Sequence, residues 1–204
     1  MSVIRAFIAI DLPPDVQECL EQVSTKLQAE IGEKAVRWVP VPNIHLTLKF
    51  LGDVSVNNLH VLQEILIAEA AHQAPLEISV GRVGAFPKIR RPRVIWVGVE
   101  APSELLTLQR SIESRTARVG YPVDEREFSP HLTLGRVSRN ASPQEVRQIG
   151  DVLSASKIGF LGVARVQSVH LYKSDLLPSG AVYTKMFTAP FGGSQRDPFG
   201  EAEI

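Results

Sequence analysis

The chain has 204 residues, of which 44% are hydrophobic and 22% are charged, a composition typical of a soluble globular protein that is long enough to bury a core. Lysine plus arginine and aspartate plus glutamate are equal at 22 each, so the net charge excludes a strongly basic nucleic-acid binder or membrane-surface protein. The single cysteine, Cys19, excludes an internal disulfide framework and suits a reducing compartment. The first residues read as a strand and not as a signal peptide, and no apolar run is long enough to span a membrane, so we expect a cytoplasmic protein.

The first part of the chain predicts a strand, a helix, a second strand and a second helix. Residues 3–12 are rich in apolar and β-branched side chains, and residues 15–31 carry apolar side chains at helical spacing after two prolines. Residues 43–52 read as a strand, and residues 57–74 as a second amphipathic helix.

The middle of the chain predicts a hairpin and a third helix. Residues 76–86 and 93–100 are both strand-like and flank the basic segment KIRRPR at 88–93, a pattern that indicates a long hairpin or two strands. The helix is expected over residues 103–120, with Ser103 as its N-cap and Gly120 past its end.

The last part of the chain repeats the strand and helix order. A strand begins at residue 131, and a fourth helix over 142–153 starts with Ser142 as a cap and Glu145 three residues later, the spacing of a capping box. Residues 160–174 and 181–191 read as strands, and residues 191–204 have the composition of a flexible tail.

This order indicates two similar units without a linker between them. Strand, helix, strand and helix are followed by further strands, and the same series then occurs again. We therefore expect an α+β fold with two pseudo-symmetric lobes, each an antiparallel sheet with outer helices, and a catalytic cleft between the lobes. Residues 1–190 would form this single bilobal domain.

The most informative pattern is the tetrapeptide HLTL, which occurs at residues 45–48 and again at 131–134. Side chains alternate between the two faces of a strand, so Ile44, Leu46, Leu48 and Phe50 should anchor the first strand in its lobe. The opposite face then presents one imidazole and one hydroxyl. Leu132 and Leu134 play the same anchoring part in the second strand.

Two such pairs that face each other suit acid–base chemistry on a phosphate. Imidazole titrates near neutral pH, so one of the two residues His45 and His131 can take a proton from water while the other gives one to a leaving oxygen. The hydroxyls of Thr47 and Thr133 can hold the non-bridging oxygens. This reasoning does not say which histidine is the acid.

An arginine would assist, and the nearest candidate is Arg136. The apolar alternation slips after Gly135, so a β-bulge there would turn Arg136 toward the groove, whereas without the bulge it is a surface arginine. His60 and His72 are expected to meet solvent or a C-terminal carbonyl of their helix. His170 shares its strand phase with Tyr172 and could face the groove, but it is expected at the surface. The KIRRPR segment is either a solvated loop or, if it borders the cleft, a track for an RNA backbone.

Other chemistries fit this sequence less well. Zinc requires three or four ligands, threonine is a poor one, and neither HExxH nor a cysteine–histidine cluster occurs. A GxSxG elbow, a GxGxxG loop and a Walker-type loop are missing as well. The prediction is therefore phosphoester chemistry with neither a metal nor a cofactor.

The paired HLTL segments resemble the two HxTx motifs of the two-histidine phosphoesterases, and in particular the RNA 2′,3′-cyclic phosphodiesterases, also called 2′–5′ RNA ligases or LigT-like proteins. The resemblance extends to RAFIAI, VRWVPVPNIHLTLKFLG, RPRVIWVGV, EREFSPHLTLGRV and LYKSDLLPSGAVY, and covers roughly residues 3–190.

The resemblance implies a bilobal α+β fold that hydrolyses RNA 2′,3′-cyclic phosphate ends to 2′-phosphates without a metal. It implies that His45 is the proton donor to the leaving oxygen and His131 the proton acceptor from water, with Thr47 and Thr133 on the phosphate. Phe7 and Phe128 are candidates for stacking on a base.

Several alternatives stay open. The same mechanism could act on a small cyclic nucleotide, an ADP-ribose cyclic phosphate or a 2′–5′ oligoadenylate, or the groove could bind RNA ends without chemistry. Minor 2′–5′ RNA ligation, the reverse reaction, would be a side activity. The expected partner is RNA with a 2′,3′-cyclic phosphate end and not a membrane, and the protein would act as a monomer.

Overall fold

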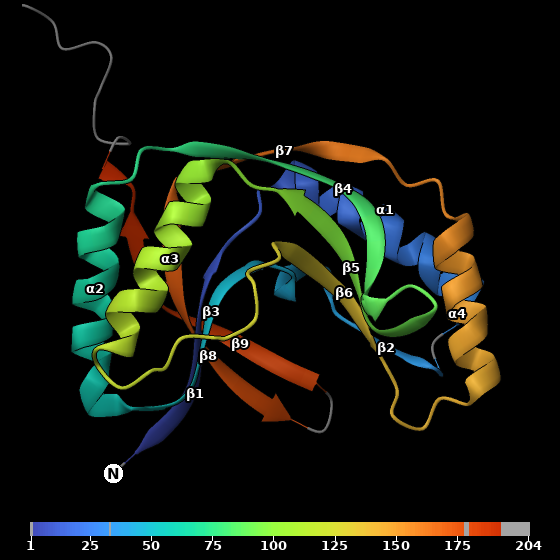
Figure 1. Cartoon of the computed structure of the whole chain (residues 1–204), viewed down its shortest axis with the longest axis horizontal. Helices are drawn as coiled ribbons and strands as arrows, with labels where there is room; N and C mark the ends of the chain where they lie inside the picture. Colours follow the sequence, from blue (N-terminus) through green and yellow to red (C-terminus); the bar gives the residue numbers. More distant parts are fainter. Residues whose placement is uncertain (1, 33, 178–179, 193–204) are drawn as a thin grey trace, which may run out of the picture.

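The fold is known from a computed structural model that describes residues 2–32, 34–177 and 180–192. In these residues the chain forms one antiparallel sheet flanked by helices (Figure 1). The strands are β1 (Val3–Ile10), β2 (Val36–Trp38), β3 (Leu46–Ser55), β4 (Leu76–Lys88), β5 (Arg91–Glu100), β6 (His131–Val137), β7 (Phe160–Val166), β8 (Ser168–Leu177) and β9 (Gly180–Pro190). The α-helices are α1 (Pro14–Ile31), α2 (Leu59–Ala71), α3 (Ser103–Ala117) and α4 (Pro143–Ala155). No helix among the described residues is long and apolar enough to cross a membrane.

The two halves of the sheet have equivalent strand arrangements when each is followed outward from the middle. The order is β7-β4-β5-β6-β3-β1-β8-β9, and the short strand β2 pairs with β6. The first lobe is β3-β1-β8-β9 and the second is β6-β5-β4-β7, so each HLTL strand has an apolar strand and then two more strands on its outer side. The two lobes meet at β3 and β6. This arrangement confirms the predicted pair of similar lobes.

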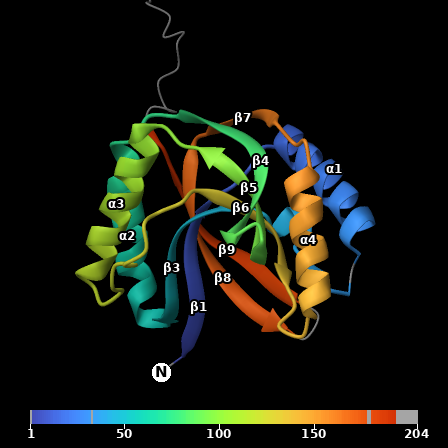
Figure 2. The ribbon, with the colours of Figure 1, turned by 45° about the vertical axis from the view of Figure 1, so that its right-hand side comes forward.

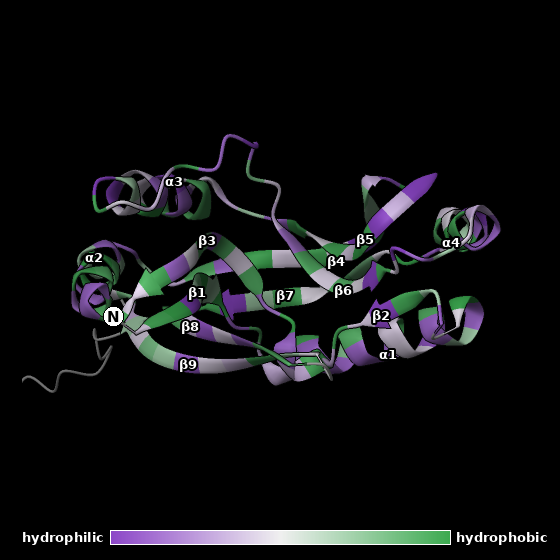
Figure 3. Ribbon diagram, turned by 90° about the horizontal axis from the view of Figure 1, so that it is seen from below, coloured by the Kyte–Doolittle hydropathy of each residue, from purple (hydrophilic) through white to green (hydrophobic). Residues whose placement is uncertain are grey.

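The helices form two pairs, one on each lobe (Figures 1 and 2). The pair α2 and α3 packs on the first lobe, against β8, β9 and β3, whereas α1 and α4 pack on the second lobe, against β7 and β5. Helix α1 follows a strand of the first lobe and α3 follows a strand of the second, so each crosses to the other lobe. Seen from below, the strands lie between the two pairs (Figure 3).

The helix boundaries follow from local sequence. Helix α4 begins with the expected capping box, in which the Ser142 hydroxyl accepts from the Glu145 backbone N–H and the Glu145 carboxylate accepts from the Ser142 N–H. The predicted N-cap of α3 is wrong by one residue, because Pro102 occupies that position and the Ser103 hydroxyl donates to Glu104 instead. Gly120 adopts φ +99° past the end of this helix, as expected.

Two strand predictions have different outcomes. The long hairpin is confirmed, since β4 pairs with β5 from Ser79–Glu100 to Lys88–Arg91, with the KIRRPR segment at its turn. The single strand expected over 160–174 is instead two strands: β7 pairs with β4 in the second lobe, whereas β8 pairs with β1 in the first. The chain therefore passes from one lobe to the other at Gln167. Of the predicted tail, residues 193–204 lie outside the described part.

Candidate active site

The two HLTL motifs lie side by side at the junction of the lobes. Strands β3 and β6 are antiparallel and pair at Leu46 and Leu132, both fully buried on the helix side. Continuing this register places His45 across from Thr133 and Thr47 across from His131. The histidine and threonine side chains of both motifs therefore lie on one face of the sheet, opposite the helices, which we call the motif face.

Each motif strand contains a β-bulge at the same position. In the first lobe Ala9 pairs with Thr47 and Ile8 with Lys49, which leaves Leu48 unpaired. In the second lobe Trp96 pairs with Thr133 and Ile95 with Gly135, and the residue left unpaired is Leu134. The predicted bulge is thus present in β6, one residue earlier than expected.

The bulge in β6 turns Arg136 to the motif face. The β5 partners of His131, Thr133 and Arg136 are Gly98, Trp96 and Val94, which alternate along β5 and share one face. Cross-strand partners point to the same side of a sheet, so Arg136 lies beside Thr133. This is the placement that the slip in the apolar pattern predicted.

The bulge in β3 overturns the expectation that Phe50 belongs to the core. Phe50 is 61% exposed, and it pairs with Phe7, whose ring centroid lies 6.2 Å from its own. Both Phe50 and Arg136 follow their motif histidine by five residues. The first lobe therefore presents an exposed aromatic ring at the position where the second lobe presents an arginine.

His45 is enclosed by aromatic rings. Its centroid lies 4.7 Å from that of Phe7 in a stacked arrangement, 5.8 Å from Tyr172, and 5.2 Å from Tyr183 in an edge contact. Burial lowers the pKa of His45 to about 4, although the Asp11 carboxylate and a hydrogen bond to the backbone of Asn43 act in the opposite direction. The imidazole is thus neutral near pH 7 in the free protein.

This enclosure contradicts the stacking role expected for Phe7. The Phe7 side chain is only 2% exposed and packs against the rings of His45 and Tyr172, so it has no free face for a base. Phe50 has such a face, and regular strand alternation predicts it in the core only because the sequence does not indicate the bulge in β3. The second candidate, Phe128, is half-buried and packs against the core, and its contact with a base stays a prediction.

His131 has a different environment. Its Nδ1 lies 2.7 Å from the Ser129 carbonyl oxygen, and the Phe86 ring meets it edge-on at 4.9 Å between centroids. Burial lowers the pKa of His131, the hydrogen bond to Ser129 raises it and the charge of Arg136 lowers it further. Because a carbonyl can only accept, Nδ1 carries the proton, and the lone pair of the neutral ring is on Nε2.

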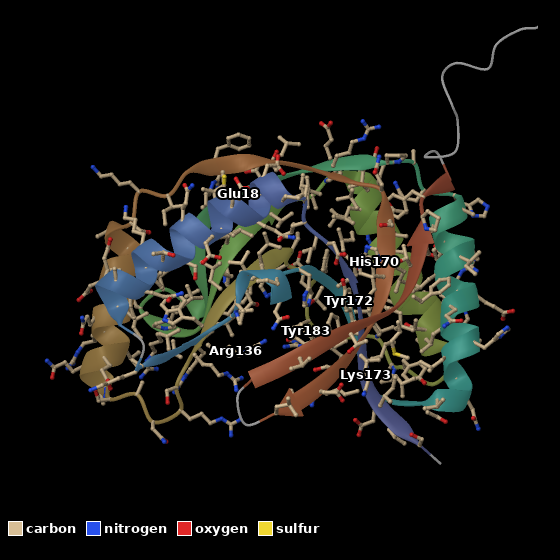
Figure 4. The ribbon with its side chains drawn as sticks, turned by 180° about the vertical axis from the view of Figure 1, so that it is seen from behind. Glu18, Arg136, His170, Tyr172, Lys173 and Tyr183 are labelled. Atoms are coloured by element: carbon tan, nitrogen blue, oxygen red, sulfur yellow. The ribbon has the colours of Figure 1, made fainter. Side chains whose placement is uncertain are left out.

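Beside His45 lies a pocket of about 120 Å³ whose lining includes Asp11, Tyr172 and Tyr183. The Tyr172 hydroxyl and the Lys185 ammonium each donate to the Asp11 carboxylate at 2.5 Å. Tyr172 and Tyr183 come from β8 and β9 of the first lobe, and Arg136 comes from β6 of the second (Figure 4). Sequence reasoning missed both tyrosines, because only the pairing of β8 and β9 brings them to the first motif.

The expectation that His170 lies at the surface is wrong. His170 lies on β8 and is the register partner of Ala9 on β1, and Ala9 in turn pairs with Thr47 on β3. The residue is only 5% exposed. Its two ring nitrogens lie 3.1 Å from the Ser168 hydroxyl and 3.0 Å from the Thr188 hydroxyl. His170 is therefore a satisfied structural histidine behind Asp11, at 3.5 Å from that carboxylate.

Comparison with known proteins shows which family has this sequence and fold. The sequence model of the family described as LigT like Phosphoesterase matches residues 10–96 and again residues 97–183, which is the internal repeat. RNA 2′,3′-cyclic phosphodiesterases are similar to the chain: that of Methanothermobacter thermautotrophicus is 33% identical, with 90% of this chain and 96% of the relative covered. That of Escherichia coli K12 is 34% identical, with 89% and 93% covered.

Solved structures agree with the fold. The crystal structure of TT0787 of Thermus thermophilus superimposes with a TM-score of 0.78 at 26% identity, covering 93% of this chain and 99% of that one. The structure of E. coli LigT complexed with 3′-AMP has a TM-score of 0.74 at 26% identity, with the same coverage of both chains.

Proposed function

The chain belongs to the LigT-like phosphoesterase family, and we propose that it hydrolyses RNA 2′,3′-cyclic phosphate ends to 2′-phosphates. The observation that carries this proposal is the register of β3 against β6, which brings two imidazoles, two hydroxyls and Arg136 to one face of the sheet. The relatives named above act on the same linkage. Both motifs come from one chain, so the reaction needs no second copy, and we propose a monomer acting in the cytoplasm.

In the proposed reaction, His131 accepts a proton from water through Nε2 while the water oxygen attacks phosphorus. The bond between phosphorus and the 3′ oxygen breaks, and His45 gives its proton to that oxygen. The products are a 2′-phosphate and a free 3′-hydroxyl, and the two imidazoles exchange protons with solvent before the next cycle. Thr47, Thr133 and Arg136 donate to the non-bridging oxygens as their charge grows.

The neighbours of the two histidines support this assignment of acid and base. Burial lowers the pKa of both rings, but Asp11 raises that of His45, whereas Arg136 lowers that of His131. Nearby charge therefore favours the protonated form of His45 and the neutral form of His131. The anionic cyclic phosphate raises both pKa values when it binds, which allows His45 to hold a proton near neutral pH.

The base of the terminal nucleotide would stack on Phe50. The centroid distances from Phe7 to His45 and to Phe50, 4.7 Å and 6.2 Å, limit the separation of the His45 and Phe50 centroids to 10.9 Å. Phe50 is thus close enough for one nucleotide to contact both. Stacking on an aromatic ring tolerates any base, which suits an enzyme that acts on RNA ends of different sequence.

The test is incubation of the purified protein, in the presence of EDTA, with a short RNA that ends in a 2′,3′-cyclic phosphate. We expect ring opening to a 2′-phosphate, with His45→Ala and His131→Ala each reducing the rate by about two to four orders of magnitude. Thr47→Ala or Thr133→Ala should cost less, roughly ten- to a thousandfold. The exposed His72, whose Nδ1 lies at hydrogen-bond distance from the Ala68 carbonyl of its own helix, provides the control variant His72→Ala, which should keep the wild-type rate.

Two of the alternatives have their own outcomes in this assay. Turnover of 2′,3′-cyclic AMP but not of RNA would indicate a small cyclic nucleotide as the substrate. Binding of the RNA end without turnover, unchanged in His131→Ala, would indicate a non-catalytic module. Either histidine variant retaining a near wild-type rate would exclude the two-histidine mechanism.

A further inference from the structure

A second arginine lies next to Arg136 on the motif face. Strand β2 pairs with β6 on the side away from β5, and Arg37 is the register partner of Arg136. Directly paired residues of an antiparallel ladder point to the same side of the sheet, with their Cα atoms about 4.5–5.5 Å apart. Both side chains are exposed. The two guanidinium groups therefore start from neighbouring positions and extend over the same face.

Neither arginine is neutralised by a carboxylate of the described residues. Within residues 2–32, 34–177 and 180–192, no carboxylate forms an ion pair with Arg37 or Arg136. Arg82, Arg115 and Arg126, by contrast, each have a carboxylate partner. Like charges directly opposite each other in a sheet repel, so an anion bound at the two guanidinium groups would relieve this repulsion.

The pair also continues a line of positive charge. On its other side, Arg136 pairs with Val94 of β5. Beyond Val94 the β4–β5 hairpin ends with Lys88 paired to Arg91, and both are exposed. The local charge therefore differs from the zero net charge of the whole chain. A polyanion that extends from the catalytic phosphate across β6 would meet Arg37 next.

From this we propose that Arg37 binds the backbone phosphate on the 5′ side of the terminal nucleotide. The inference rests on the proposed function and adds that the preferred substrate is a polynucleotide end instead of a mononucleotide. Arg136 reaches the cyclic phosphate from β6, and Arg37, one strand further from Thr133, reaches the neighbouring phosphodiester. The planar guanidinium group forms paired hydrogen bonds to phosphate oxygens, which fixes the direction in which the RNA leaves the site.

The test measures the affinity of the wild type and of the variants for two substrates at several salt concentrations. One is a pentaribonucleotide with a 2′,3′-cyclic phosphate end, and the other is 2′,3′-cyclic AMP, which has no upstream phosphate. Each neutralised phosphate of a single strand contributes about 0.7 to the slope of log affinity against log salt concentration. Replacing Arg37→Gln should lower that slope for the pentanucleotide by about 0.7. A rise from 50 to 200 mM salt would then weaken the variant by about 2.6-fold less than the wild type.

The controls separate this site from a general effect. Arg37→Lys keeps the charge and should retain the wild-type slope, and Arg110→Gln, on the outer helix α3, removes the same charge away from the motif face and should change nothing. For 2′,3′-cyclic AMP the slope of Arg37→Gln should equal that of the wild type. An unchanged slope on the pentanucleotide, or an equal change on both substrates, would overturn the proposal.

A binding measurement keeps this proposal independent of catalysis. Fluorescence anisotropy of the wild type and of Arg37→Gln with a labelled pentanucleotide ending in a 2′-phosphate measures the same salt slope without turnover. If the wild type hydrolyses neither substrate, the proposed function fails, while the anisotropy slopes still decide whether Arg37 contacts the RNA backbone.

Discussion

Lys49 and Glu113 form a buried ion pair that connects the first motif to the chain leading into the second. Lys49 is 3% exposed, and its ammonium group donates to the Glu113 carboxylate and, at 2.5 Å, to the Pro122 carbonyl. The same carboxylate accepts from the Asp124 backbone N–H at 3.3 Å. Glu113 belongs to α3, and the segment at Pro122 leads from that helix toward His131.

Removing one partner of this pair should destabilise the fold strongly. In Lys49→Met the Glu113 carboxylate stays buried without its countercharge, which in other proteins costs about 3–5 kcal/mol. In a chain of this size, 1 kcal/mol shifts the melting temperature by roughly 2–4 °C, so the expected decrease is roughly 6–20 °C. Urea unfolding followed by circular dichroism measures the free energy, and a thermal scan measures the melting temperature.

Two further variants test the reasoning. The double variant Lys49→Met, Glu113→Leu removes both charges and should recover most of the loss, because a buried pair can be replaced by apolar side chains of similar volume. Arg82→Met breaks the Arg82–Glu100 pair, whose side chains are 80% and 75% exposed, and should cost less than about 1 kcal/mol. A loss below 1 kcal/mol in Lys49→Met, or a double variant less stable than the single one, would refute the argument.

Two further predictions concern the site itself. Burial lowers the pKa of His45 and of His131 in the free protein, so kcat/KM, which reports the free enzyme, should peak below pH 6.5 and fall as pH rises and His45 loses its proton. The bound anion raises both pKa values, so the kcat profile should lie at higher pH; two coincident profiles with a maximum above pH 7 would contradict these shifts. Phe50→Ala should weaken binding of adenosine 2′-monophosphate roughly 5- to 150-fold, the range for loss of one stacking contact, and leave inorganic phosphate unaffected. The matched control is Phe160→Ala, in which another exposed phenylalanine is lost from the edge strand β7, and titration calorimetry with both ligands measures the difference.

Much of the fold could be predicted because local patterns and the repeat agree. The capping box of α4 and the apolar spacing of all four helices are local signals, and tertiary packing did not override them. The division of 160–174 into β7 and β8 is not local. Both segments are apolar and β-branched, and only the requirement that each lobe have four main strands places them in different lobes of the one sheet.

In the site, too, local patterns predict some features, and those that depend on strand pairing are missed. A slip in the apolar pattern revealed the bulge of β6, because Val137 follows Leu134 out of phase. The bulge of β3 leaves no such signal. Residues 48–51 read LKFL, so both faces of the strand carry apolar side chains there. The one polar residue, Lys49, is itself buried in an ion pair. Regular alternation consequently predicts Phe50 in the core, whereas the bulge turns it to the motif face. The partners of His45 that come from β8 and β9 follow from strand pairing over more than 120 residues, which no spacing in the sequence encodes.

In the proposed mechanism, the differences between the two lobes let a symmetric pair of motifs act on an asymmetric substrate. A cyclic phosphate needs an acid on one side and a base on the other, yet His45 and His131 occupy equivalent positions. Their surroundings differ: His45 has Asp11 nearby and Phe50 on its strand, whereas His131 has Arg136 on its strand and Arg37 beyond it. In the proposed mechanism the aromatic side would hold the base and the cationic side the phosphates, so a nucleotide would fit in one orientation. That orientation would place the leaving oxygen toward the histidine that has the carboxylate neighbour.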